Sequence, residues 1–126
     1  ALGLMQVMPA TGAQVASSLG QRHSNADLLQ VEHNVLLAST YYRQLLDRFN
    51  GNRVLALTAY NAGPHRVDRW RNKPQDAVSV ELWIETIPYR ETRNYVQAVL
   101  SYNVVFQHLM GDTVTLLSNA ERQAVY

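Results

Sequence analysis

Five polar or aromatic side chains in otherwise apolar segments are the residues of this sequence that could do chemistry. They are Gln6, Tyr60, Asn61, Glu85 and Tyr95. Carboxamides, phenols and a carboxylate together offer hydrogen-bond donors and acceptors. When such groups are carried on apolar helices, they suit a neutral ligand rich in hydroxyl and amide groups, such as an amino-sugar polymer.

Tyr60 and Asn61 come just before Gly63 and Pro64, which predict the end of an apolar helix. Glycine tolerates the left-handed dihedrals of a helix C-terminus, and proline cannot continue the preceding helix. Two interpretations stay open at this point. The stretch is either a helix end with a packed tyrosine, or a surface that presents a phenol and a carboxamide to a ligand.

The roles of Gln6 and Glu85 depend on whether their side chains are buried. Gln6 lies in the apolar run 2–9, which we expect to be a short, buried turn or helical segment. A buried carboxamide needs partners, so Gln6 either bonds to nearby backbone or faces a cleft. A buried Glu85 requires a cation or several donors, and Arg90 and Arg93 follow it closely. Glu85 is therefore expected to form a structural ion pair or to contact a ligand.

The elements that position these residues are predicted to be helices. We expect helices at 12–19 with Thr11 as cap, from Asn25 to about residue 49, and at 53–62, 65–71 and 89–110, with a short one after the capping-box pattern at 118–121. Two long helices show apolar stripes at three- and four-residue spacing: Val31, Val35, Ala38, Tyr42, Leu45 and Phe49 in the first, and Tyr95, Val99, Tyr102, Phe106 and Leu109 in the second. No strand alternation is evident, and the fold class is mostly α.

Composition excludes several functions. The 126 residues carry 11 Lys+Arg and 10 Asp+Glu, interspersed, so no basic stripe indicates nucleic acid. No apolar run approaches the roughly 20 residues that span a bilayer, and without cysteine there is no thiol chemistry. The histidines, His23, His33, His65 and His108, lack the spacing and nearby carboxylates of a zinc site. We therefore expect surface or satisfied histidines and no metal.

Three stretches, in this order and spacing, resemble segments of the soluble lytic transglycosylases that cut bacterial peptidoglycan, a goose-lysozyme-like family. They are GLMQVMP at 3–9, AYNAG at 59–63 and ETIPYRETRNYV at 85–96. The resemblance spans nearly the whole chain. The third stretch is similar to the large periplasmic type, in which the C-terminal catalytic domain follows a long helical region.

This resemblance implies a lysozyme-like helical domain that cleaves the β-1,4 bond between N-acetylmuramic acid and N-acetylglucosamine and leaves 1,6-anhydromuramoyl ends. It implies no cofactor, a periplasmic location, and two partners: peptidoglycan glycan strands and an N-terminal helical domain of the parent protein. A goose-type lysozyme, which uses water, and a non-catalytic peptidoglycan-binding module are the alternatives.

The family places its general acid and base, a glutamate, upstream of the GLMQ segment, and therefore before Ala1. Residues 1–126 are then expected to be the C-terminal part of the catalytic domain, with no catalytic glutamate and no activity alone. Glu85 matches a different glutamate, used in glycan binding. The positions that the resemblance assigns to substrate binding are Gln6, Met8, Ala59, Tyr60, Asn61, Glu85 and Tyr95, with Tyr60 supporting the upstream carboxylate, Ala59 offering its carbonyl and Tyr95 supporting the wall.

Overall fold

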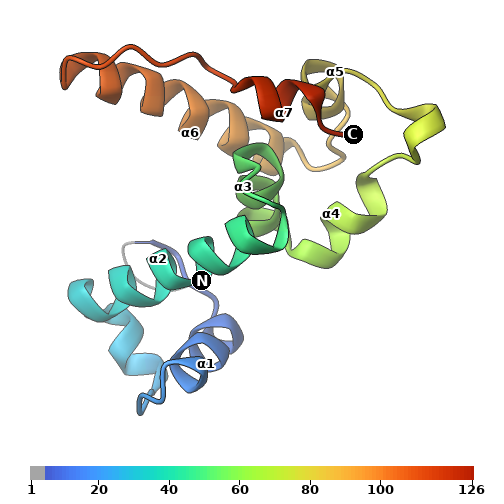
Figure 1. Cartoon of the computed structure of the whole chain (residues 1–126). Helices are drawn as coiled ribbons and strands as arrows, with labels where there is room; N and C mark the ends of the chain where they lie inside the picture. Colours follow the sequence, from blue (N-terminus) through green and yellow to red (C-terminus); the bar gives the residue numbers. More distant parts are fainter. Residues whose placement is uncertain (1–4) are drawn as a thin grey trace. The chain divides into compact units, whose positions relative to one another are not determined.

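A computed structural model describes residues 5–126, and its regular secondary structure is helical throughout those residues (Figure 1). The chain divides into two compact units, residues 1–47 and 48–126, which are described separately. The mostly α fold class predicted from the sequence is confirmed.

The first unit contains helix α1 (Pro9–Ser18), the 3-10 helix η1 (Asn25–Leu29) and most of α2 (Val31–Arg48). Helix α1 begins three residues earlier than predicted, because Pro9 has no N–H to leave unpaired at a first helical position. Thr11 therefore lies inside the helix and does not cap it. The helix ends at Ser18, one residue before the predicted end, and Gly20 follows the cap residue with φ +67°.

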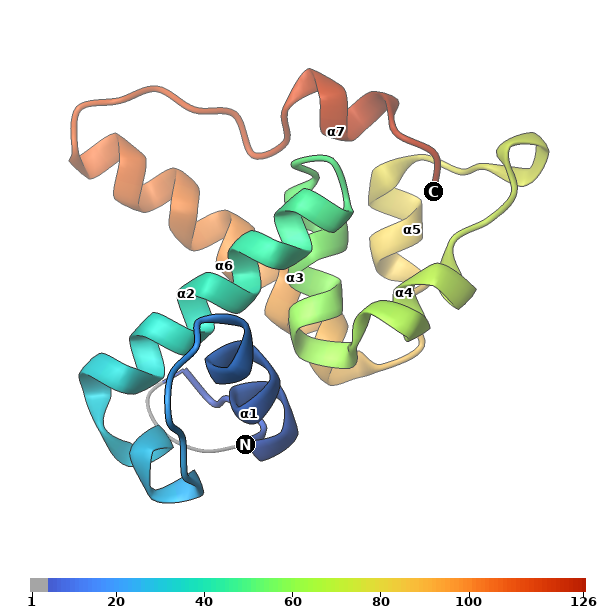
Figure 2. The ribbon, with the colours of Figure 1, turned by 60° about the horizontal axis from the view of Figure 1, so that its bottom comes forward.

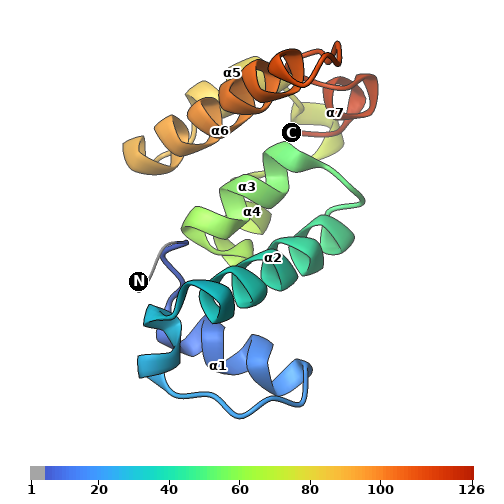
Figure 3. The same cartoon turned by 90° about the vertical axis from the view of Figure 1, so that its left-hand side faces the viewer.

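Helices α1 and α2 lie side by side in the first unit, and Gln44 Nε2 donates a hydrogen bond to Ser18 Oγ at 3.3 Å (Figure 3). The predicted apolar stripe of α2 is only partly right. Ala38 and Leu45 are buried as expected, but Val31 and Val35 are 60% and 40% exposed. The buried residue near the start of α2 is Asn34, which is polar. Its burial is possible because its side-chain oxygen accepts the Met5 N–H at 2.6 Å.

The second unit is arranged around α3 (Arg53–Ala62), whose predicted bounds are confirmed. Seven of its ten residues are buried, and it packs against α4 (Pro64–Trp70) and α6 (Arg90–Leu109) (Figure 2). The 3-10 helix η2 (Pro74–Asp76) and helix α5 (Val80–Glu85) connect α4 to α6. Asn52 caps α3, since its Oδ1 accepts the Leu55 N–H at 3.0 Å.

Helix α6 has the predicted bounds within one residue at each end, but most of its predicted apolar stripe is not covered. The buried side chains are Thr92, Val96 and Leu100, in the first half of the helix. The predicted positions in the second half are exposed: Tyr102 by 71%, Phe106 by 60% and Leu109 by 78%. The apolar spacing predicted the helix itself. Which of its residues are buried depends on where α3 and α5 pack against it.

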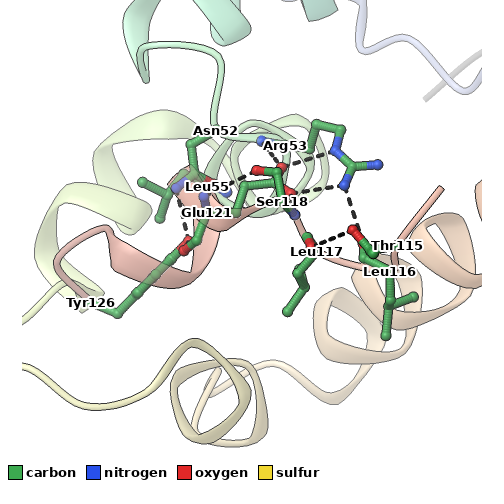
Figure 4. Close-up of polar contacts among 9 residues, drawn as sticks. All are labelled: Asn52, Arg53, Leu55, Thr115, Leu116, Leu117, Ser118, Glu121 and Tyr126. Carbon is green, nitrogen blue, oxygen red and sulfur yellow. Dashed lines mark hydrogen bonds and ion pairs between the residues drawn. The ribbon is translucent and has the colours of Figure 1, made fainter.

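After α6 the chain doubles back, and α7 (Asn119–Gln123) meets the start of α3 (Figure 4). Arg53 Nε and Nη2 donate to the two Glu121 carboxylate oxygens at 2.9 and 2.8 Å, and the Arg53 N–H donates to the same carboxylate at 3.0 Å. The predicted Ser118–Glu121 capping box is present. Burial raises the pKa of Glu121, but the hydrogen bonds from Arg53 and Ser118 outweigh it, so the pKa is lowered from 4.5.

Tyr126 is fully buried beside this ion pair. Its hydroxyl accepts a hydrogen bond from Asn52 Nδ2 at 2.8 Å and donates to the Glu121 carbonyl at 2.6 Å. Its ring lies 5.5 Å from that of Trp83, and burial raises the pKa of its phenol. The residues from Glu121 to Tyr126 therefore fix the N-terminal end of α3 in place.

Candidate functional site

Tyr60 and Tyr95 form a stacked aromatic pair in the second unit. Tyr60 is in the last turn of α3 and Tyr95 in the second turn of α6; their ring centroids are 6.3 Å apart and their planes differ by 11°. Both side chains are half-buried, and burial raises the pKa of Tyr95. A phenol that is partly packed and partly open can hold its ring in place while its hydroxyl meets a ligand.

Asn61, the next residue, is exposed but held by α6. Its Oδ1 accepts a hydrogen bond from Thr92 Oγ1 at 2.6 Å, and Thr92 is only 1% exposed. Since this oxygen is engaged, the Nδ2 donors are the groups that Asn61 can turn toward a ligand. Sequence reasoning did not single out Thr92, although it lies inside the third segment of the family resemblance.

The helix end beneath these side chains is closed by Gly63, as predicted. Gly63 has φ +96°, a conformation that strains any residue with a Cβ, and Pro64 starts α4 directly after it. The Gly63 N–H donates to the Ala59 carbonyl at 2.7 Å. Ala59 is itself fully buried, and this hydrogen bond uses one of the two lone pairs of its carbonyl oxygen.

Glu85 is set among apolar neighbours in the sequence, but its side chain is not buried. It is exposed at the end of α5 and accepts a hydrogen bond from Gln97 Nε2 at 2.8 Å. The expected ion pair is wrong: within the described chain neither Arg90 nor Arg93 pairs with it, and Arg93 Nη2 donates to the Ile87 carbonyl at 3.1 Å. Glu85 directly follows Ile84, but its side chain lies outside the buried apolar face that Trp83, Ile84 and Ile87 form.

Glu85 and Gln97 border a shallow pocket between α5 and α6. Its volume is about 190 Å³, and Glu81, Leu100 and Leu117 are among its other lining residues. Ligand pockets usually enclose roughly 300–1,000 Å³. The pocket is therefore too small to enclose a disaccharide, and Glu85 could contact a sugar only at an open surface.

Gln6 and Met8 belong to the first unit, and their segment is less buried than predicted. Among the described residues of 2–9, only Val7 is buried; Met5 and Met8 are 43% and 56% exposed, and Gln6 is exposed. Gln6 has φ +52°, which is uncommon for a residue other than glycine, and this turn directs the side chains on either side of Val7 outward. Positions 2–4 of this segment lie outside the described residues.

Two of the histidines also depart from expectation. His23 Nδ1 and His33 Nε2 are 3.0 Å apart, and Asp27 lies in the same group. The prediction that no carboxylate neighbours a histidine is therefore wrong for this pair, because η1 turns the chain back between them. His65 and His108 are exposed, as predicted.

The described residues contain no helix that is long and apolar enough to cross a membrane. Comparison with known proteins adds the family. The family model "Transglycosylase SLT domain" matches residues 1–83, and "Soluble lytic transglycosylase helical domain" matches residues 86–114. The soluble lytic murein transglycosylases of Salmonella typhimurium and Escherichia coli K12 are 36% and 37% identical to this chain over 100% and 96% of its length.

Two solved structures are similar over nearly the whole chain. The 70 kDa soluble lytic transglycosylase of Escherichia coli matches 98% of this chain and 20% of its own, with a TM-score of 0.90 and 35% identity. An inactive glutamate-to-glutamine mutant of the lytic transglycosylase Slt from Pseudomonas aeruginosa matches 95% of this chain and 20% of its own, with a TM-score of 0.85 and 42% identity.

The chain spans about a fifth of the length of these relatives. The first of these family models covers well over half of the chain and includes the segments at 3–9 and 59–63. The segment at 85–96 lies in the second matched region except for its first residue. The chain therefore belongs to the transglycosylase SLT domain family.

Proposed function

We propose that this chain is the C-terminal part of a catalytic domain that cleaves the β-1,4 bond between N-acetylmuramic acid and N-acetylglucosamine and leaves 1,6-anhydromuramoyl ends. The observation that carries the proposal is the end of α3, where Tyr60 stacks on Tyr95 and Asn61 is held by Thr92. In a chain of this family, such a group of fixed donors suits the amide and hydroxyl groups of an amino sugar.

In this proposal one glutamate of the longer protein, in the segment before Ala1, protonates the oxygen that leaves the anomeric carbon. The resulting carboxylate then takes the proton of the muramic C6 hydroxyl as that oxygen attacks the same carbon. One C–O bond breaks, one forms, and no water is consumed. The Pseudomonas aeruginosa relative is inactive when glutamine replaces one of its glutamates, which supports a requirement for one carboxylate in that protein.

The residues of this chain act as binding and positioning groups in the proposal. The Tyr60 hydroxyl orients the glutamate, and Tyr95 holds the Tyr60 ring. Asn61 donates to the sugar, whereas the buried Ala59 carbonyl accepts the Gly63 N–H and so holds the helix end that carries Asn61. The other contacts expected from the resemblance, Gln6, Met8 and Glu85, are exposed and accessible to a glycan strand. A glutamate works as an acid near neutral pH only where its surroundings hold its pKa high.

Replacing Tyr60 by Phe in the longer protein tests the positioning role. The ring and its stacking remain, and only the hydroxyl is lost. We expect turnover of peptidoglycan to fall about tenfold or more, with the melting temperature nearly unchanged. Tyr89→Phe is the matched control, since Tyr89 is a 45% exposed tyrosine whose ring contacts with Trp70 and Arg66 the substitution keeps. Wild-type turnover by Tyr60→Phe would count against the role.

The non-catalytic alternative is separated by comparing two proteins. Because the general acid lies outside this chain, residues 1–126 should bind glycan strands without cleaving them, whereas the longer protein should do both. General acid–base catalysis contributes roughly 10²–10⁴-fold, so cleavage by the isolated chain should be lower by at least that factor. Binding without cleavage by both proteins would favour a peptidoglycan-binding module.

We further propose that the N-terminal helical domain of the longer protein covers the exposed apolar face of α6, and that the whole works in the periplasm. Tyr102, Val105, Phe106, Leu109 and Met110 are between 58% and 78% exposed. Apolar groups gathered on one helix face are typical of an interface. About four-fifths of each of these two relatives lies outside the region that matches this chain. The corresponding part of the longer protein is the proposed partner of this face. Leu109→Asp should lower the melting temperature of the longer protein and leave that of residues 1–126 unchanged.

A further inference from the structure

Two histidines and an aspartate meet in the first unit, and none of the three is among the residues assigned to substrate binding. His23 lies in the loop between α1 and η1, Asp27 in η1, and His33 in the first turn of α2. One ligand atom of each lies within 4.8 Å of the other two, and all three side chains are half-buried. The turn between α1 and α2 thus gathers three side chains of the types that bind metal ions.

The two imidazoles are spaced almost as two ligands of one ion are. His23 Nδ1 and His33 Nε2 are 3.0 Å apart, and the rings are stacked with centroids 5.3 Å apart. Two nitrogens bound to one Zn²⁺ at 2.0–2.1 Å in tetrahedral geometry are separated by about 3.3–3.4 Å. The nitrogen separation is therefore within a few tenths of an ångström of that of two ligands of one ion. Binding would also turn the rings so that a lone pair of each nitrogen faces the ion, in place of the hydrogen bond between them.

The orientation of His23 is fixed from behind. Its Nε2 is buried with no hydrogen-bond partner in the described structure. A Cβ at Gly12 of α1 would lie 3.1 Å from this nitrogen and 3.0 Å from Leu28 Cδ2. The absence of a side chain at Gly12 therefore makes room for the ring, and the ring points Nδ1 at His33.

Asp27 is also positioned by its neighbours. Its Oδ2 accepts the Ser24 N–H at 2.7 Å, as part of a capping box at the start of η1. A carboxylate held by such an outer hydrogen bond keeps its second oxygen in a defined direction, which is common for metal ligands. His23 and Asp27 are thus positioned by their neighbours, and His33 is carried by the first turn of α2.

We propose that His23, Asp27 and His33 form a binding site for a divalent transition-metal ion such as Zn²⁺, with water completing the coordination. Two imidazoles and one carboxylate suit Zn²⁺ and similar ions, whereas Mg²⁺ and Ca²⁺ take oxygen ligands. A bound ion would join the 20–30 loop to the start of α2. Its role would be to stabilise the first unit, and it takes no part in glycan cleavage.

The test is calorimetric titration of chelator-treated residues 1–126 with ZnCl₂ and, separately, CaCl₂. We expect one Zn²⁺ per chain and no saturable Ca²⁺ binding. Loss of an outer-shell partner alone weakens metal sites about 10–100-fold. Removing a ligand with His33→Gln or His23→Gln should therefore weaken Zn²⁺ binding by about 100-fold or more. Asp27→Asn keeps an acceptor for Ser24 and should weaken it less.

His65→Gln and His108→Gln are the matched controls, since both residues are exposed histidines outside the group. A second measurement uses the wild-type chain and does not depend on the folding of any variant. Addition of Zn²⁺ should shift the ¹⁵N NMR signals of His23 Nδ1 and His33 Nε2. The ring signals of His65 and His108 should not change. Absence of saturable Zn²⁺ binding, or equal binding by His33→Gln and His108→Gln, would overturn the proposal.

Discussion

Replacing Glu121 by alanine should destabilise the second unit strongly, because this one carboxylate holds the returning tail on α3. Glu121 is 3% exposed, and it accepts hydrogen bonds from the Arg53 guanidinium, the Arg53 N–H and the Ser118 N–H (Figure 4). Glu121→Ala leaves all of these donors without their acceptor. It also removes the capping box of α7.

The magnitude follows from the exposure of the remaining partner. Breaking a buried ion pair by removing one member costs about 3–5 kcal/mol. The Arg53 side chain is 27% exposed and keeps a bond to the Leu116 carbonyl at 3.1 Å, so water and this carbonyl recover part of the loss. We therefore expect the free energy of unfolding to fall by about 2–4 kcal/mol, a large share of the roughly 5–15 kcal/mol of a typical domain.

The assay is urea unfolding followed by tryptophan fluorescence. Both tryptophans, Trp70 and Trp83, lie in the second unit, and Trp83 packs against Tyr126, so the signal reports on this unit. Glu81→Ala is the matched control, because it removes the Arg122–Glu81 ion pair, whose side chains are 51% and 57% exposed. An exposed pair contributes little. Equal effects of the two substitutions would refute the reasoning.

Three further predictions follow from the same contacts. The pKa of Glu121 is lowered on folding, so its contribution to stability is present above its unfolded value near 4.5 and is lost as the pH falls through the lower folded value; urea titrations between pH 7 and 3 should show this dependence in wild type and not in Glu121→Gln. Thr92→Val removes the bond to Asn61 and should lower unfolding free energy by about 0.5–1.5 kcal/mol in the same urea assay; turnover of the longer protein should also fall, and a variant with full turnover would show that Asn61 needs no support. Gly12→Ala brings a Cβ to 3.1 Å from His23 Nε2 and should weaken Zn²⁺ binding in the titration; unchanged binding would show that the ring needs no room at Gly12.

The sequence predicted best what depends on neighbours along the chain. The bounds of α3 follow from Asn52 at its start and from Gly63 and Pro64 at its end, and the structure has those bounds. The capping box at Ser118 was found in the same way. These features are set by backbone geometry and local hydrogen bonds, and they do not depend on what packs against the helix.

The predictions that failed concern which side of an element is covered. Glu85 was expected among apolar neighbours, but it lies one position beyond the buried face of α5. The stripe through Tyr102 and Phe106 marks one face of α6, but within the described residues the buried side chains of this helix are Thr92, Val96 and Leu100. Periodicity gives a helix its faces and does not say which face has a partner.

The candidate site contains residues that the sequence predicted and one that it did not. Tyr60, Asn61 and Tyr95 were named from the sequence, and the structure brings Tyr60 and Tyr95 into contact across α3 and α6. Thr92 was missed because only the fold shows that its hydroxyl meets Asn61. His23 and His33 were judged separately, because their closeness depends on the turn at η1.

The most direct test of the proposed reaction is mass spectrometry of the fragments that the longer protein releases from purified peptidoglycan in H₂¹⁸O. Attack by the muramic C6 hydroxyl consumes no water, so we expect 1,6-anhydromuramoyl ends, lighter than reducing ends by one water molecule and free of ¹⁸O. A goose-type lysozyme would release reducing muramic ends that carry ¹⁸O. Such labelled reducing ends as the main product would contradict the proposed transglycosylase reaction.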